Sequence, residues 1–218
     1  MITPSDKAYR LAKQIKKGEK SIPHPYSGLA KWIQSKYSVK VLNVSFCIIK
    51  PDNRPRLSID LETEEDRKVF ERSRFCYDSK KSSAIIKKFQ EISNKTSLDV
   101  STEKIFVVFS DFESIARIEA NEKVSEDIID NFIERFQSEN IWCIQRAFSN
   151  LIVFYYSENE KDQAIKKGMI NQYQTAFSKI IEPYDEFGYL INNPIIPHID
   201  SKENFDQNYQ SSWFYYWR

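Results

Sequence analysis

One order of predicted elements occurs twice in this chain, and this repeat restricts the fold more than any other feature. Each copy has an amphipathic helix, two strands joined by a short turn, and the capped start of another helix. The caps are Thr63 and Ser157, which are 94 positions apart (157 minus 63). The predicted strands span 42–49, 56–61, 141–148 and 151–156. The repeat indicates an α+β protein built from two helix–hairpin–helix halves.

The strand patterns predict antiparallel or mixed sheets with helices packed on one face. Leu57 and Ile59 alternate with Ser58 and Asp60, as expected for a strand with one buried and one solvated face. A polar stretch at 94–102 suggests a boundary between halves. We therefore predict an N-terminal α-ββ-α half at 1–98 with a basic leading helix, and a second half at 99–218, unless both form one continuous domain.

The second half resembles the ferredoxin-like order βαββαβ. An apolar run at 105–109 predicts a central strand, and 187–191 predicts a final one. The resemblance is topological, and no family motif accompanies it. Because this fold carries many unrelated functions, it implies no activity.

Several classes of function are disfavoured by composition. The four glycines stand far apart, which excludes a glycine-rich phosphate loop, and we expect no cofactor. No secretory signal or membrane-length apolar run is present, so we expect a cytoplasmic protein without a membrane partner. The three cysteines lack metal-binding spacing.

The formal net charge of +1 conceals an uneven distribution. Residues 1–40 carry nine Lys or Arg against Asp6 and Glu19, a balance of +7, and the remaining residues sum to −6. A helix at 7–20 places lysines opposite its apolar stripe. We interpret it as a surface helix docked on the body; an alternative is a helix that lies on nucleic acid or an anionic membrane.

Few residues are suited to catalysis. His24 and His198 are the histidines of the chain. His198, Asp200 and Asp206 could bind a divalent metal, but they lack the spacing of a zinc or EF-hand motif. Asp60 lies at the end of one predicted strand, and Asp111 follows another. Together with His198, Asp200 and Asp206, these carboxylates define the alternative of a metal-dependent hydrolase or nuclease. We expect no catalytic residues.

Aromatic side chains give a second alternative. Strand aromatics such as Trp142, Phe148 and Phe154 would suit an RNA-binding ferredoxin-like sheet, which stacks bases on its rings. The strands lack the accompanying glycines and the body is acidic, so we expect core aromatics and no nucleic acid.

The C-terminal residues 213–218 are five consecutive aromatics followed by an arginine. We expect a final strand that pairs into the sheet; the alternative is an interaction or homodimer edge, since Trp, Tyr and Arg anchor interfaces. The candidate partner-binding aromatics are Trp213, Tyr215, Tyr216 and Trp217.

Together these features favour a non-catalytic cytoplasmic protein that binds another protein. In style the polar, aromatic-rich, motif-free chain is similar to many small bacterial immunity proteins, which neutralise a partner toxin; no residue motif is shared. A cationic toxin would be attracted by acidic residues. The acidic candidates are Glu62, Glu64, Glu65 and Asp66.

Overall fold

The computed structural model describes all residues except 1–2, 74–75, 97–103 and 137–138. The chain forms two compact units, Met1–Ile115 and Ala116–Arg218, which we call unit 1 and unit 2. Both mix helices with small sheets, so the predicted α+β class is confirmed. The division between the two units lies within helix α5 (Phe112–Lys123), and the strand at 106–111 pairs within unit 1. The predicted boundary at 98/99 lies outside the described residues.

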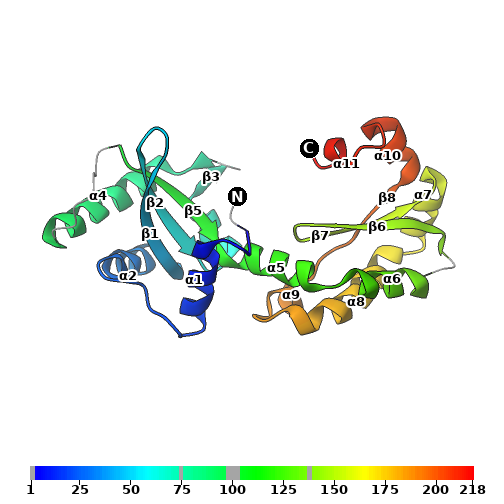
Figure 1. Cartoon of the computed structure of the whole chain (residues 1–218), viewed down its shortest axis with the longest axis horizontal. Helices are drawn as coiled ribbons and strands as arrows, with labels where there is room; N and C mark the ends of the chain where they lie inside the picture. Colours follow the sequence, from blue (N-terminus) through cyan, green and yellow to red (C-terminus); the bar gives the residue numbers. More distant parts are fainter. Residues whose placement is uncertain (1–2, 74–75, 97–103, 137–138) are drawn as a thin grey trace. The chain divides into compact units, whose positions relative to one another are not determined.

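Unit 1 is built around a three-stranded sheet in the order β1-β2-β5 (Figure 1). β1 and β2 are antiparallel, as the hairpin pattern predicted, and β2 and β5 are parallel. β3 and β4 form a separate two-stranded ribbon. The elements before α5 are α1 (Lys7–Lys16), α2 (Tyr26–Tyr37), β1 (Val41–Ile49), β2 (Arg54–Leu61), α3 (Glu64–Lys68), β3 (Glu71–Ser73), β4 (Cys76–Tyr77), α4 (Ser79–Thr96) and β5 (Phe106–Asp111).

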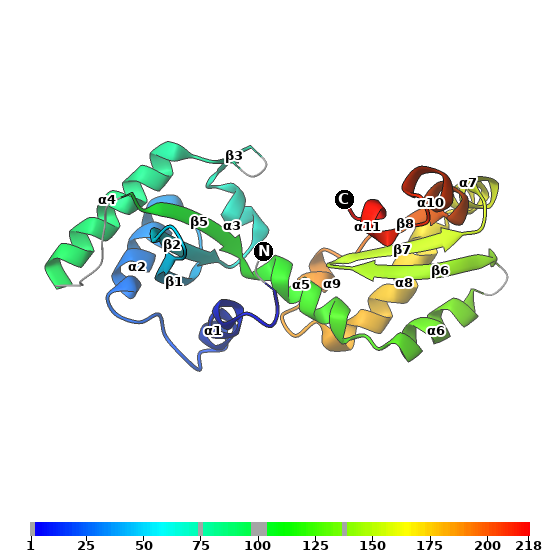
Figure 2. The same ribbon diagram turned by 45° about the horizontal axis from the view of Figure 1, so that its top comes forward.

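The core of unit 1 lies between the sheet and helices α2 and α4. Leu57 and Ile59 of β2 are fully buried there, with Ile33 of α2 and Phe89 of α4. Helix α1 covers part of the opposite face, as Figure 2 shows, and its Tyr9 stacks on Phe112 at 5.0 Å between ring centroids. The basic leading helix is therefore docked on its own unit.

Unit 2 contains a second three-stranded sheet in the order β6-β7-β8. β6 and β7 are antiparallel and β7 and β8 are parallel. Figure 1 shows α6 and α8 on one side of the β6–β7 hairpin and α10 and α11 on the other. The elements after α5 are α6 (Glu126–Arg135), β6 (Ile141–Ala147), β7 (Asn150–Tyr155), α7 (Glu158–Lys166), α8 (Met169–Ile181), the 3-10 turn η2 (Glu182–Tyr184), α9 (Tyr189–Asn192), β8 (His198–Ser201), α10 (Lys202–Tyr209) and α11 (Trp213–Tyr216).

This arrangement corrects three predictions about the second half. The ferredoxin-like order is not formed, since β5 pairs with β2 of unit 1 and lies at a sheet edge. Tyr189–Asn192 is a helix, and the third strand is His198–Ser201. Helices cover both faces of the unit 2 sheet, not one, because both faces carry apolar side chains such as Val153 and Phe154.

The repeat predicted from the sequence is present in both units and extends further than expected. Each sheet has the same order and strand directions, and a register shift occurs at the same place in β1 and β6. Thr63 and Ser157 both accept a hydrogen bond from the backbone three residues later, with a complete capping box at Ser157.

A second pair of matching contacts joins the helix after the second strand to the helix after the third. In unit 1, Glu64 N–H donates to the Glu113 carboxylate at 3.2 Å. In unit 2, Glu158 N–H donates to the Glu203 carboxylate at 3.0 Å. Each unit therefore has the same sheet order, one capped helix after the second strand, and a carboxylate that accepts a backbone N–H in the first turn of that helix.

The C-terminal aromatic segment was predicted to be a strand, which is wrong. Trp213–Tyr216 forms the short helix α11. Trp213 and Tyr216 are three residues apart, so one helical turn places both rings on the inner side, whereas strand geometry would alternate them. No helix within the described residues is long and apolar enough to cross a membrane.

Candidate functional site

The outer layer of unit 2 begins with a row of side chains across its sheet. The strand register aligns Cys143, Phe154 and Asp200 on one face of β6, β7 and β8. Phe154 is fully buried. Burial raises the pKa of the Cys143 thiol to about 11, so this thiol stays protonated and packs as an apolar group.

Aromatic rings from α10 and α11 seal this row. Around Phe154 the ring centroids of Trp142, Trp213 and Tyr216 lie at 5.8, 5.4 and 5.3 Å. Phe205 of α10 lies 4.2 Å from Trp213. Offset and edge-on aromatic packing of this kind adds to the free energy of simple burial. The inner side of α11 is therefore a structural anchor.

A partly buried polar contact fixes the direction of α11. The Tyr216 hydroxyl donates to Asp200 at 2.6 Å, and the Asn204 side-chain amide donates to the same carboxylate at 2.8 Å. Burial, and next the bond to Asp200, raise the pKa of Tyr216, so its hydroxyl remains a donor at neutral pH. Since Tyr216 is held, the outer side of α11 is held as well.

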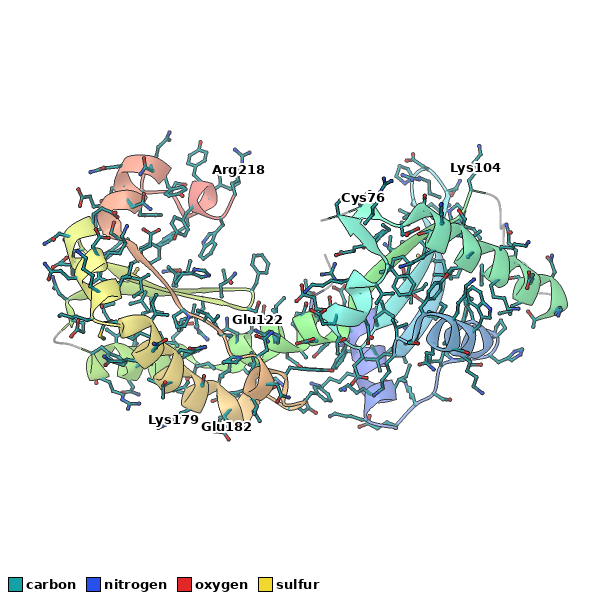
Figure 3. All side chains as sticks on the ribbon, turned by 180° about the vertical axis from the view of Figure 1, so that it is seen from behind. Cys76, Lys104, Glu122, Lys179, Glu182 and Arg218 are labelled. Carbon is teal, nitrogen blue, oxygen red and sulfur yellow. The ribbon has the colours of Figure 1, made fainter. Side chains whose placement is uncertain are left out.

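The outer side of α11 carries large aromatic side chains in solvent. Phe214 is 65% exposed, Tyr215 44% and Trp217 37%. The guanidinium of Arg218 lies 4.8 Å from the Phe214 ring centroid, and Figure 3 shows Arg218 at the end of the helix. We call these four residues the α11 patch. Its residue types are those that anchor protein interfaces.

The predicted partner-binding aromatics therefore divide into two pairs. Tyr215 and Trp217 belong to the α11 patch, and Trp213 and Tyr216 are part of the anchor. Phe214 is exposed and was missed, because the sequence was interpreted as a strand. Helical spacing of the five aromatics would have predicted this division.

The predicted acidic surface lies in unit 1, and its carboxylates have partners within the chain. Glu62 forms ion pairs with Lys16 and Lys40. Burial alone would raise the pKa of Glu62, but the hydrogen bonds and charges of the two lysines outweigh burial and lower it. Partial burial and two cationic partners make Glu62 a structural residue.

The other three acidic candidates lie in the first turn of α3, where carboxylates favour the helix N-terminus. Glu64 and Glu65 form ion pairs with Lys68. Asp66 accepts the Lys40 backbone N–H at 3.3 Å. Engagement within the chain leaves these residues less available to a partner than their sequence suggested.

The candidate metal ligands of unit 2 are also engaged. Asp200 accepts from Tyr216 and Asn204. Asp206 forms an ion pair with Lys202 and accepts from Ser211, and these bonds lower the pKa of Asp206. His198 lies exposed at the start of β8. Among the described residues, no three His, Cys, Asp or Glu gather as a metal site would require.

The row equivalent to Cys143, Phe154 and Asp200 is polar in unit 1. Asp60 is 5% exposed; Ser110 donates to one of its oxygens at 2.5 Å and Asn43 to the other at 3.1 Å. Burial raises the pKa of Asp60 despite both bonds. The neighbouring Asp111 forms an ion pair with Arg67 at 2.8 Å.

These carboxylates line a cavity of about 10 Å³ together with Tyr9 and Phe112. A space of this size holds about one water molecule. It is too small for an organic substrate.

No family model, curated protein or solved structure matches this chain.

Proposed function

We propose that this protein is a non-catalytic cytoplasmic binding module that engages a cationic partner protein through the α11 patch. The observation that carries the proposal is the exposure of Phe214, Tyr215 and Trp217 on a helix whose inner side is fixed. A rigid aromatic surface binds with a small loss of side-chain entropy. Exposed apolar clusters of this kind mark interaction sites.

The charge of unit 2 supports a cationic partner. Residues 116–218 carry 10 Lys or Arg against 16 Asp or Glu, a net charge of −6. An acidic surface attracts a basic protein over long distances and raises the association rate. We therefore propose that the net negative charge of unit 2, rather than the acidic stretch at 62–66, attracts the cationic partner.

One specific form of the proposal is a toxin-neutralising, immunity-type protein. Such a protein acts by covering its partner, which requires an exposed anchor and favourable charge but no reactive groups. The free cysteines Cys47, Cys76 and Cys143 suit a reducing compartment.

The test is site-specific crosslinking in cells that naturally make the protein. A photo-reactive amino acid at Tyr215 is compared in the parent chain, in the double variant Phe214→Ser/Trp217→Ser, and in the control Ile191→Ser. Ile191 is 68% exposed but lies on α9, outside the patch. We expect one basic protein to crosslink to the parent and to Ile191→Ser and to be lost from the double variant.

With the purified partner, calorimetry measures the size of the effect. An interface anchor contributes about 2 kcal/mol or more, so we expect the double variant to raise the Kd by at least about 30-fold. Equal crosslinking in the patch variant and the control contradicts the proposal. So does concentration-dependent self-association through the patch, which would assign it to a second copy.

A further inference from the structure

One face of the unit 1 sheet is partly exposed in the rows near the β1–β2 turn. On this face the register aligns Ser45 with Ser58, and Cys47 with Arg56 and Phe106. Cys47 is exposed and the other four side chains are partly exposed. In the unit 2 row equivalent to Ser45 and Ser58, Ile152 is only 6% exposed. In the row equivalent to Cys47 and Arg56, Asn150 is exposed.

Helix α1 covers only one end of this face. Its Tyr9 and Ala12 lie beside Asp60 and Ser110, in the last row of the sheet. The rows toward the β1–β2 turn lie beyond this contact.

The open end of the face is basic. Arg54 and Arg56 are two residues apart on β2, so both point to this side of the sheet. Lys50 lies in the adjoining turn, and Lys104 precedes β5 and projects away from the ribbon in Figure 3. In the part of the chain that the structure describes, no carboxylate forms an ion pair with Arg54, Arg56 or Lys104.

A cation–aromatic stack lies among these charges. The guanidinium of Arg54 is 4.8 Å from the Phe106 ring centroid, and Arg54 itself is exposed. The stack holds a flat cationic group at the surface. Bases of single-stranded nucleic acids stack on arginine planes and aromatic rings, and their phosphates pair with Lys and Arg.

The charge of the whole unit favours the same ligand. Residues 1–115 carry 22 Lys or Arg against 15 Asp or Glu, a net charge of +7. A positive domain attracts phosphate chains by releasing their counterions. The earlier expectation of no nucleic acid rested on an acidic body, and that acidity belongs to unit 2.

We infer that this surface of unit 1 binds a single-stranded nucleic acid. Lys50, Arg54, Arg56 and Lys104 contact its phosphates, and a base stacks on the Arg54–Phe106 pair. This differs from the RNA-binding alternative based on the aromatics of the second half, because Phe154 and its neighbours there are covered by α10 and α11. The inference concerns unit 1 and does not depend on the α11 patch.

The test measures binding of the full chain to fluorescent 20-nucleotide oligo(U) and oligo(dT) between 50 and 200 mM salt. For about three to four phosphate contacts on a single strand we expect log Kobs to fall with log[salt] at a slope of about −2 to −3. Arg54→Gln/Arg56→Gln should reduce the magnitude of this slope by about 1.4, and should weaken binding about 10-fold or more at 50 mM salt.

Two further variants separate charge from stacking. Phe106→Leu should keep the salt slope and weaken binding about 5- to 100-fold, since it removes the ring under Arg54. The control Lys80→Gln/Lys87→Gln removes the same charge from exposed positions of α4, which packs on the opposite sheet face. We expect it to change the affinity less than 3-fold.

Three results would overturn the inference. The first is absence of binding at 50 mM salt, and the second is an equal loss in the α4 control. The third is equally tight binding of an abasic strand or polyglutamate, which would identify a general polyanion or an acidic protein as the ligand. Loss of crosslinking at the α11 patch would leave all of these measurements unchanged, so the two proposals fail separately.

Discussion

The equivalent rows of the two sheets place a carboxylate on different strands. In unit 1 the acid is Asp60 on the central strand, held by Asn43 and Ser110 from its two neighbours. In unit 2 the central position is Phe154, and the acid is Asp200 on the edge strand, held by Tyr216 of α11. The apolar side chain of Phe154 on the central strand is buried by α10 and α11. The carboxylate of Asp200 on the edge strand holds α11 in place through its hydrogen bond with Tyr216.

The comparison separates a shared framework from the surfaces built on it. Both units keep the strand order, the register shift and the caps at Thr63 and Ser157. The framework therefore does not depend on what lies over the second face. The row differs at all three positions, and this difference coincides with a partly exposed, cationic sheet face in one unit and an aromatic layer in the other.

The largest expected effect comes from removing the centre of the aromatic layer. Phe154→Ala deletes a fully buried ring that four other rings contact, and should destabilise unit 2 by about 3–5 kcal/mol. Urea unfolding followed by tryptophan fluorescence measures this, because three of the four tryptophans lie in unit 2. A loss below about 1 kcal/mol would show that the layer is not a stabilising element.

The next largest effect is on the pH dependence of stability and comes from Asp60, which occupies the position in unit 1 equivalent to Phe154. Because burial raises the pKa of Asp60 in the folded state, its protonated form is favoured by folding, and the stability that this provides at low pH is lost as the pH rises through the folded-state value. Asp60→Asn removes this titration. Relative to the parent, the variant should gain stability with rising pH, by at most about 1.4 kcal/mol per pH unit.

Urea unfolding of both proteins from pH 4 to pH 8, followed by circular dichroism, checks this slope. Asp206→Asn is the control: because the pKa of Asp206 is lowered, its titration lies below this pH range, and its difference from the parent should stay nearly constant between pH 4 and pH 8. A constant difference between parent and Asp60→Asn across this range would contradict the raised pKa.

The smallest effect compares the shared caps. Thr63→Ala and Ser157→Ala each remove the acceptor for a helix N–H and should cost about 1 kcal/mol. We expect the larger loss at Ser157, whose capping box also involves Glu160. Urea midpoints of the full chain give both values. A negligible effect at only one site would show that the frameworks are not energetically equivalent.

Local sequence patterns predicted the parts of the fold that depend on local interactions. The two hairpins and the caps at Thr63 and Ser157 follow from alternation and side-chain chemistry within a few residues. The partner of β5 could not be predicted in this way, because its parallel pairing joins residues about 50 positions apart. Pairing over such a distance leaves no local pattern.

Three parts of the candidate surfaces were not predicted, each for a different reason. β8 has only four residues, and its His198, Asp200 and Ser201 are typical of a polar loop. The aromatics at 213–217 were assigned to a strand on composition, although Trp213 and Tyr216 have helical spacing. The basic sheet face could not be predicted, because Arg56 and Phe106 become neighbours only when β2 pairs with β5.

The late position of the third strands has a consequence for synthesis of the chain. Each hairpin can form as soon as it leaves the ribosome, but β5 and β8 close their sheets only after residues 62–105 and 156–197 have been made. During these intervals one edge of β2 or β7 offers unpaired backbone groups to other nascent chains. Slow translation of either interval should therefore promote aggregation of this protein more than slow translation within a hairpin.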